Sequence, residues 1–250
     1  MAIRHLTDDV TWVYETHEIG DGRQVHSSLH LITTDEGNLL INSGDHDLRE
    51  EFERQIDEVV GDEGVDTIFA QESHIPNSAN VSAFRREWDA DIIFPGGASP
   101  IHGFPEVIQW PQYGTEELFG RTFDLTRGPL LDLPHTTWIF DRQSGVLFSL
   151  EGFCYYHYPG EEGSLSTELE DGIRYEDVKD FYDEMLLWLK YADPDKLLTN
   201  LRETVGEYDI EYVAPAHGNP IAAADLDTYM DHISRAVTEI ADSYEFKMTA

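Results

Sequence analysis

The segment Glu72-Ser73-His74-Ile75-Pro76-Asn77-Ser78-Ala79-Asn80 follows an apolar run, Val65 to Ala70, that predicts a buried strand. Within the segment, Glu72 and His74 are two residues apart, so their side chains point the same way if the loop is locally extended. A carboxylate and an imidazole held side by side are suitable ligands for Fe, Mn or Zn. The segment therefore predicts one part of a metal site at the end of a strand.

Further donors must come from other parts of the chain, because a metal ion is held by several ligands that converge from different segments. The residues that could supply them are Glu72, His74, Asp132, His135, Glu151 and His217. His135 follows a proline and is a candidate either for a ligand or for a group that orients one through a hydrogen bond. The first metal position is therefore predicted to combine Glu72 and His74 with Glu151 and one of Asp132 or His135.

A second metal position is predicted to be poorer. Pro76 has no donor atom, and Asn77 offers only a weak neutral oxygen, so Asn77 is expected to be structural rather than a ligand. His217 and Glu151 would remain as its donors. The residues predict one good metal position and one doubtful position.

The order of apolar patterns predicts an α/β protein with layers around a sheet core, in a single domain over residues 1–250. Strands are predicted over 11–14, 28–33, 38–42, 65–70, 91–95, 122–125, 137–141, 146–149 and 210–214. Helices are predicted over 47–60, 82–88, 175–191, 195–205 and 222–245.

Four segments resemble the metallo-β-lactamase fold in the right order. The spacing of residues 72–80 is similar to the first metal-binding loop, H-x-H-x-D-H-x-G-N, with Glu72, His74, Pro76 and Asn77 at the four ligand positions. Residues 40–44 resemble the strand that ends in D-x-G or D-[ST]-G, residues 147–151 the L-F-[ST]-x-D strand, and residues 214–218 the late P-x-H-G element. The resemblance implies a four-layer αββα sandwich, with Glu151 as the bridging carboxylate and His217 as the last ligand.

One branch of that superfamily, the β-lactamase-like diiron domain of flavodiiron proteins, is more similar than the others. It has H-x-E-x-D-H in the first loop and P-x-L-H-W-P-D-S in the second. Residues 129–136 match the second motif without a gap, except that Asp132 and His135 have exchanged places, and Glu72 and His74 are exchanged relative to H-x-E. The two exchanges suggest a rebuilt site that keeps its total ligand character.

The resemblance implies a mono- or dinuclear iron centre that reduces O₂ or NO or senses oxygen, with zinc or manganese as other candidates. It also implies a homodimer by analogy. The flavodoxin-like domain that supplies FMN is not found in residues 1–250, so FMN is not expected to be bound by this chain alone and a separate electron-donor protein is expected.

Two alternatives stay open at this point. One is a zinc-dependent hydrolase of the same fold, in which the metal lowers the pKa of a bound water. The other is a non-catalytic binding or sensing module with a degenerate site. Both alternatives take a small-molecule ligand or substrate, and no catalytic residue can be assigned.

Composition limits the partners. The chain has 50 Asp and Glu against 16 Lys and Arg, a formal net charge of −34, spread along its length. This favours a halophilic source, where a carboxylate shell keeps a protein hydrated, and it argues against nucleic acid as a partner. The N-terminal residues have no apolar core of signal-peptide length and no apolar run is long enough for a membrane span, so a cytoplasmic protein is expected.

Overall fold

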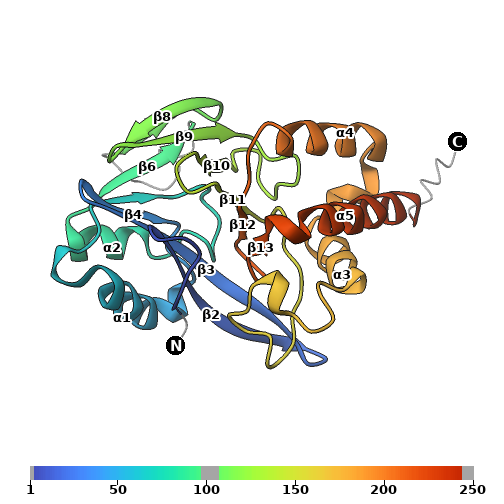
Figure 1. Ribbon diagram of the computed structural model, residues 1–250, viewed down its shortest axis with the longest axis horizontal. Helices are drawn as coiled ribbons and strands as arrows, with labels where there is room; N and C mark the ends of the chain where they lie inside the picture. Colours follow the sequence, from blue (N-terminus) through green and yellow to red (C-terminus); the bar gives the residue numbers. More distant parts are fainter. Residues whose placement is uncertain (1–2, 97–106, 244–250) are drawn as a thin grey trace, which may run out of the picture.

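The computed structural model describes residues 3–96 and 107–243, which form two β-sheets packed face to face with helices on both outer sides (Figure 1). These four layers are the αββα sandwich that the sequence predicts.

The first sheet has the strand order β1-β2-β3-β4-β5-β6-β7. Its first four strands are antiparallel and the rest are parallel. The strands are β1 (Ile3–His5), β2 (Val10–Gly20), β3 (Arg23–Thr34), β4 (Gly37–Ile41), β5 (Thr67–Phe69), β6 (Asp91–Pro95) and β7 (Ile108–Trp110). Two helices, α1 (Arg49–Val60) and α2 (Val81–Trp88), cover its outer face.

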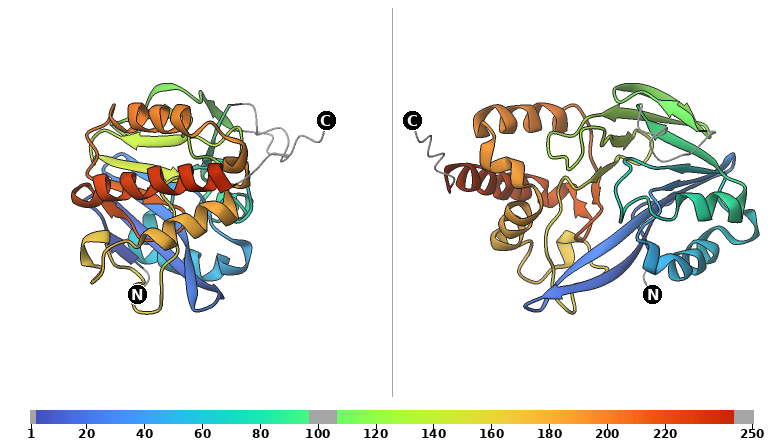
Figure 2. Two further views of the ribbon diagram at one scale, coloured as in Figure 1. Left: turned by 90° about the vertical axis from the view of Figure 1, so that its right-hand side faces the viewer. Right: turned by 180° about the vertical axis from the view of Figure 1, so that it is seen from behind.

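The second sheet has the order β13-β12-β11-β10-β9-β8, with β11 and β12 parallel. Its strands are β8 (Gly114–Leu118), β9 (Arg121–Thr126), β10 (Trp138–Asp141), β11 (Val146–Leu150), β12 (Tyr212–Pro215) and β13 (Ile221–Ala222). Helices α3 (Tyr175–Met185), α4 (Pro194–Val205) and α5 (Ala223–Ser243) lie across its outer face, as the left view of Figure 2 shows.

The central strands are apolar on both sides because both of their faces are buried. In β4, Leu40 packs with Phe52 and Ile56 of α1, whereas Leu39 and Ile41 face the other sheet. In β11, the apolar run continues through both faces, and its residues divide between the inter-sheet layer and the layer under α3, α4 and α5. Continuous apolar runs in the sequence therefore mark strands in the middle of the sandwich.

Two sequence-based boundaries differ from the structure. The strands predicted over 11–14 and 28–33 extend into the long β2–β3 hairpin, whose far end reaches the other half of the molecule (Figure 1) and pairs Gln24 with His157. The helix predicted over 175–191 ends at Met185, because Leu186 adopts φ −104° and ψ 63°, and a 3-10 turn over 187–191 follows. The predicted C-terminal helix is α5, and its expected last residues, 244 and 245, lie outside the described residues.

No helix within residues 3–96 and 107–243 combines the length and apolar character that crossing a membrane requires.

The net charge of −34 leads to a prediction on salt dependence. Carboxylates that repel one another at low salt are screened as the Debye length falls from about 10 Å at 0.1 M to below 3 Å in molar salt. We expect the melting temperature to rise by on the order of 10 °C between about 0.1 and 3 M NaCl, since several kcal/mol corresponds to that shift in a chain of this length. Thermal denaturation followed by circular dichroism measures it, with sucrose as the uncharged control; equal melting temperatures across this range would contradict the prediction.

Buried histidines lead to a second prediction, on pH. Burial lowers the pKa of His30, which is 2% exposed between the two sheets, to about 3. Its unfolded pKa is near 6.5, so the unfolded chain binds the proton first and stability falls as pH drops from 6.5 towards 3. Replacing His30 with Leu should reduce the slope of the free energy of unfolding against pH, between pH 6.5 and 3, by up to about 1.4 kcal/mol per pH unit. Urea unfolding at a series of pH values tests it, with exposed His46→Leu as the control; an unchanged slope in the His30 variant would rule the effect out.

Candidate metal centre

The predicted donors come together where parallel strands of both sheets end. Glu72 lies just beyond β5, Glu151 just beyond β11, and His217 just beyond β12. The carboxyl ends of parallel strands lie at one edge of a sheet, where ligands commonly bind in α/β proteins. Gln71 connects the two edges, because its side-chain amide donates to the carbonyls of Thr137 (2.8 Å) and Phe148 (2.9 Å).

Three of the donors form a compact cluster. One ligand atom each from Glu72, His74 and Glu151 lie within 4.8 Å of one another. Two further predicted residues are next to the cluster: Asp132 Oδ2 is 3.2 Å from His74 Nδ1, and His217 Nε2 is 3.5 Å from Glu151 Oε2.

The cluster contains two buried polar atoms that no hydrogen bond satisfies. These are His74 Nδ1 and Glu151 Oε2. His74 Nδ1 is close to the carboxylates of Glu72 (3.7 Å) and Asp132 (3.2 Å), but the alignment is not that of a hydrogen bond. A cation between these atoms would satisfy both, so the residues present fit a bound metal ion.

Electrostatics support the same conclusion. Glu72 is fully buried, and burial together with the nearby charge of Glu151 raises its pKa to about 7. Burial also raises the pKa of Asp132, and Glu151 adds to that increase while His74 opposes it. Two buried carboxylates and the partly exposed carboxylate of Asp132 repel one another, and a divalent cation removes that repulsion.

Asn77 joins the two buried glutamates. Its side-chain amide nitrogen donates to Glu72 Oε1 (2.9 Å) and to Glu151 Oε1 (2.8 Å). Asn77 is 3% exposed, and its carbonyl accepts from the backbone N–H groups of Ser43 and Gly44. A neutral N–H donor thus lies between the two carboxylates, in keeping with the structural role predicted for Asn77.

The orientation of His217 leaves one ring nitrogen available. Its Nδ1 is 2.5 Å from the backbone carbonyl of His26, an acceptor only, so Nδ1 carries the proton. Nε2 therefore presents its lone pair towards Glu151. Metal-binding histidines commonly have this arrangement, in which a second-sphere carbonyl fixes the tautomer.

His135 faces a different group. Its Nε2 accepts from the backbone N–H of Ser73 (3.3 Å) and lies 2.8 Å from the Ser73 hydroxyl. Ser73 is between Glu72 and His74, so His135 supports the loop that carries two of the donors. This placement favours the orienting role that the sequence left open.

Three residues that the sequence analysis did not single out fix the loop. Thr136 donates its hydroxyl to Glu72 Oε2 (2.5 Å), Gln71 exchanges hydrogen bonds with Asn42, and Asn80 donates to the carbonyls of Ser43 and Asp45. All of these are buried polar side chains beside the ends of strands. Gln71 directly follows the apolar run of β5, which was a signal that could have identified it, whereas no local pattern marks Thr136 or Asn80.

The turn that presents Glu151 is strained. Leu150 and Phe153 on either side have positive φ values of 48° and 67°, a conformation that non-glycine residues rarely adopt. Gly152 between them is required, since a Cβ there would come within 2.2 Å of Trp138 Cζ2. Strain of this kind is concentrated at functional sites.

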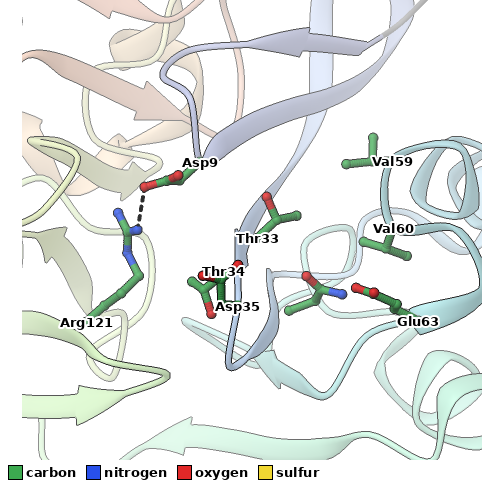
Figure 3. Close-up of a pocket in the computed structure, with 9 residues that line it drawn as sticks. Asp9, Thr33, Thr34, Asp35, Val59, Val60, Glu63 and Arg121 are labelled. Carbon is green, nitrogen blue, oxygen red and sulfur yellow. Dashed lines mark hydrogen bonds and ion pairs between the residues drawn. The ribbon is translucent and has the colours of Figure 1, made fainter.

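Two cavities are relevant to the location of the site. A cavity of about 330 Å³ opens onto the cluster and is lined by His74, Asp132, Glu151 and His217. A larger cavity of about 420 Å³ lies near the turn between β3 and β4, where Arg121 is bound to Asp9 (2.8 Å; Figure 3). Asn38, the second residue of β4, lines that cavity, whereas Asn42 follows the end of β4 and bonds Gln71 beside the cluster, so the two cavities lie towards opposite ends of the strand. The larger cavity has no histidine among its lining residues.

No protein-family model and no curated protein sequence matches the chain. Solved structures do match. A flavo-diiron protein mutant from Thermotoga maritima superposes with a TM-score of 0.79 at 16% identity, over 95% of this chain and 62% of that chain. Rubredoxin oxygen:oxidoreductase from Desulfovibrio gigas gives 0.75 at 16%, over 96% and 61%. A metallo-β-lactamase from Pontibacter korlensis gives 0.62 at 11%, over 94% and 98%.

These likenesses define the fold. The chain has the metallo-β-lactamase fold, and its structure is similar to the diiron-domain part of flavodiiron proteins. The chain spans only about 62% of the length of the flavo-diiron protein.

Proposed function

We propose that the chain binds one metal ion, most favourably iron, between Glu72, His74 and Glu151. The observation that carries this proposal is the 4.8 Å cluster of three donors, two of which have a buried atom without a hydrogen-bond partner. A set rich in carboxylate oxygen with one or two imidazoles suits Fe(II) or Mn(II). Asp132 and His217 are near enough to complete the coordination, and His135 orients the loop through Ser73.

The proposed activity is the reduction or sensing of O₂ or NO. When bound, iron supplies the redox chemistry that such a reaction needs. The residues of the chain hold and orient it: Thr136 and Asn77 fix the carboxylate of Glu72, and the His26 carbonyl fixes the ring of His217.

The proposal treats residues 1–250 as one metallo-β-lactamase-like domain that receives electrons from a separate donor protein and pairs as a homodimer, with FMN held outside this chain. The name of the similar rubredoxin oxygen:oxidoreductase supports a protein electron donor. Analytical ultracentrifugation in high salt tests the homodimer, and a monomer at all concentrations would exclude it.

Metal analysis tests the central proposal. The protein is purified without chelator in high salt, and its metal content is measured; separate samples are then reconstituted anaerobically with Fe(II), Mn(II) or Zn(II) alone, because zinc would win a direct competition at most such sites. Close to one iron per chain in the purified protein, with O₂ consumption by the iron-loaded sample in the presence of a reductant, is the expected result. Zinc as purified, with no O₂ consumption by the iron-loaded sample, would favour the hydrolase alternative, and only traces of any metal in every sample would favour the non-catalytic module.

The proposal of a single metal position leads to a further prediction. Replacing Pro76 with Asp and Asn77 with His supplies two donors where the wild-type chain has none or a weak one. We expect the metal content to rise from one towards two ions per chain, measured by elemental analysis after gel filtration. The single variant Asn77→Ala is the control, because it removes the amide between the glutamates without adding a donor. A double variant that still binds only one ion would contradict this assignment of the second position.

A further inference from the structure

The cavity at the cluster has two chemically different parts. One end contains the proposed metal ligands and Asp132. Most of the remaining wall is apolar and comes from β2, β3, the loop after β5 and the end of α3: Ile19, Val25, Pro76, Phe181, Met185 and Leu186. Phe181 also packs against the ring of His217, at 5.9 Å between ring centroids. The apolar wall therefore begins directly beside the proposed metal ligands.

The described lining residues include no Lys or Arg. Arg23 is nearby, but its guanidinium pairs with Glu184 (3.0 Å) and stacks over the ring of Tyr156 (4.6 Å). An anionic ligand would meet carboxylates at one end and no unpaired cation within the lining. The net charge of the chain, −34, opposes anions further.

The cavity is also too large for a diatomic gas. Its volume of about 330 Å³ falls at the lower end of the range of about 300–1,000 Å³ that holds organic ligands. Apolar walls with a few convergent polar groups are typical of such sites.

From these observations we infer that the cavity binds a largely apolar organic molecule without a negative charge and holds it against the proposed metal centre. The role of this cavity as a substrate or effector site rests on the proposed function. Binding of the molecule depends only on the residues that line the cavity. Ile19 and Met185 line the cavity and are 40% and 46% exposed, so they lie where the cavity opens to solvent.

A matched pair of fluorescent probes tests the inference. N-phenyl-1-naphthylamine is uncharged, and 1-anilinonaphthalene-8-sulfonate has the same two ring systems with an added sulfonate. We expect the uncharged probe to bind the metal-loaded protein at least about tenfold more tightly than the sulfonate, a difference of about 1.4 kcal/mol. The titrations are done in high salt, where non-specific charge effects are screened.

Two variants locate the binding. Met185→Glu places a carboxylate at the entrance and should weaken binding of the uncharged probe by about tenfold or more. Leu187→Glu adds the same charge two residues away, at a side chain that is 58% exposed and does not line the cavity, and should leave the affinity unchanged. Both positions are exposed, so both variants are expected to fold, and circular dichroism checks this.

Metal content is measured on the same samples, which separates the two proposals. Equal affinities for the two probes, or equal loss of affinity in both variants, would overturn the cavity inference even if metal binds. Binding that follows the predicted order in protein that takes up no metal would support the cavity inference and overturn the proposed function.

Discussion

The double variant His74→Ala and Glu151→Ala is expected to lose metal binding and to keep its fold. It removes two of the three donors of the 4.8 Å cluster, and these donors come from two separate loops. Glu72 is then the one member of the cluster that remains, and Asp132 and His217 have each lost the neighbouring ligand, so the affinity should fall by more than about 100-fold. The sheets and their apolar layers do not depend on either side chain.

Equilibrium dialysis against Fe(II) or Mn(II) measures the loss, and far-ultraviolet circular dichroism checks the fold. The matched control replaces His46 and Glu50 with Ala, since these residues are the same types at exposed positions away from the cluster. Unchanged metal stoichiometry in the His74/Glu151 variant would show that the metal is held elsewhere.

The second large effect is expected at Gln71. Its replacement by Met keeps the volume but removes the amide that accepts from Asn42 and donates to the carbonyls of Thr137 and Phe148. Those partners are buried between the sheets, and each unsatisfied buried polar group costs about 1–3 kcal/mol. We expect the free energy of unfolding to fall by about 3–5 kcal/mol, and metal affinity to fall with it because Gln71 precedes Glu72.

Urea unfolding of the metal-free protein measures the stability change separately from the metal. Gln143→Met is the control: its side-chain oxygen also accepts a hydrogen bond, from the backbone of Thr122, but on an exposed turn where water replaces the lost partner. A Gln71 variant no less stable than this control would show that the hydrogen bonds of the Gln71 amide do not stabilise the loop that carries Glu72 and His74.

The α/β class was accessible from the sequence because local apolar patterns indicate it, and the four-layer sandwich was implied by the family resemblance. The runs at 38–42 and 146–149 are apolar on both faces, as strands buried in the middle of a sandwich must be. β8 was missed because its residues, GTEEL, are mostly exposed and show no apolar alternation. The short edge strands β1, β7 and β13 were missed for lack of enough residues to show a pattern.

The candidate site was accessible only in part. The sequence identified the donor types and predicted Glu72, His74 and Glu151 as ligands. In the structure, ligand atoms of these three residues lie within 4.8 Å of one another. The sequence did not indicate that His135 faces Ser73 or that Thr136 binds Glu72, since these contacts join residues more than 60 positions apart. Such contacts depend on how the loops pack, and no local pattern records them.

The amino-acid sequence by itself determined the layered architecture and the supply of imidazole and carboxylate groups, because both depend on residue type and on short-range periodicity. Only the tertiary structure decided that Asn77 lies between two glutamates, that His217 presents Nε2, and that the cavity beside them is apolar. These features arise where β5, β11 and β12 end side by side, and long-range packing of two sheets sets the distances there.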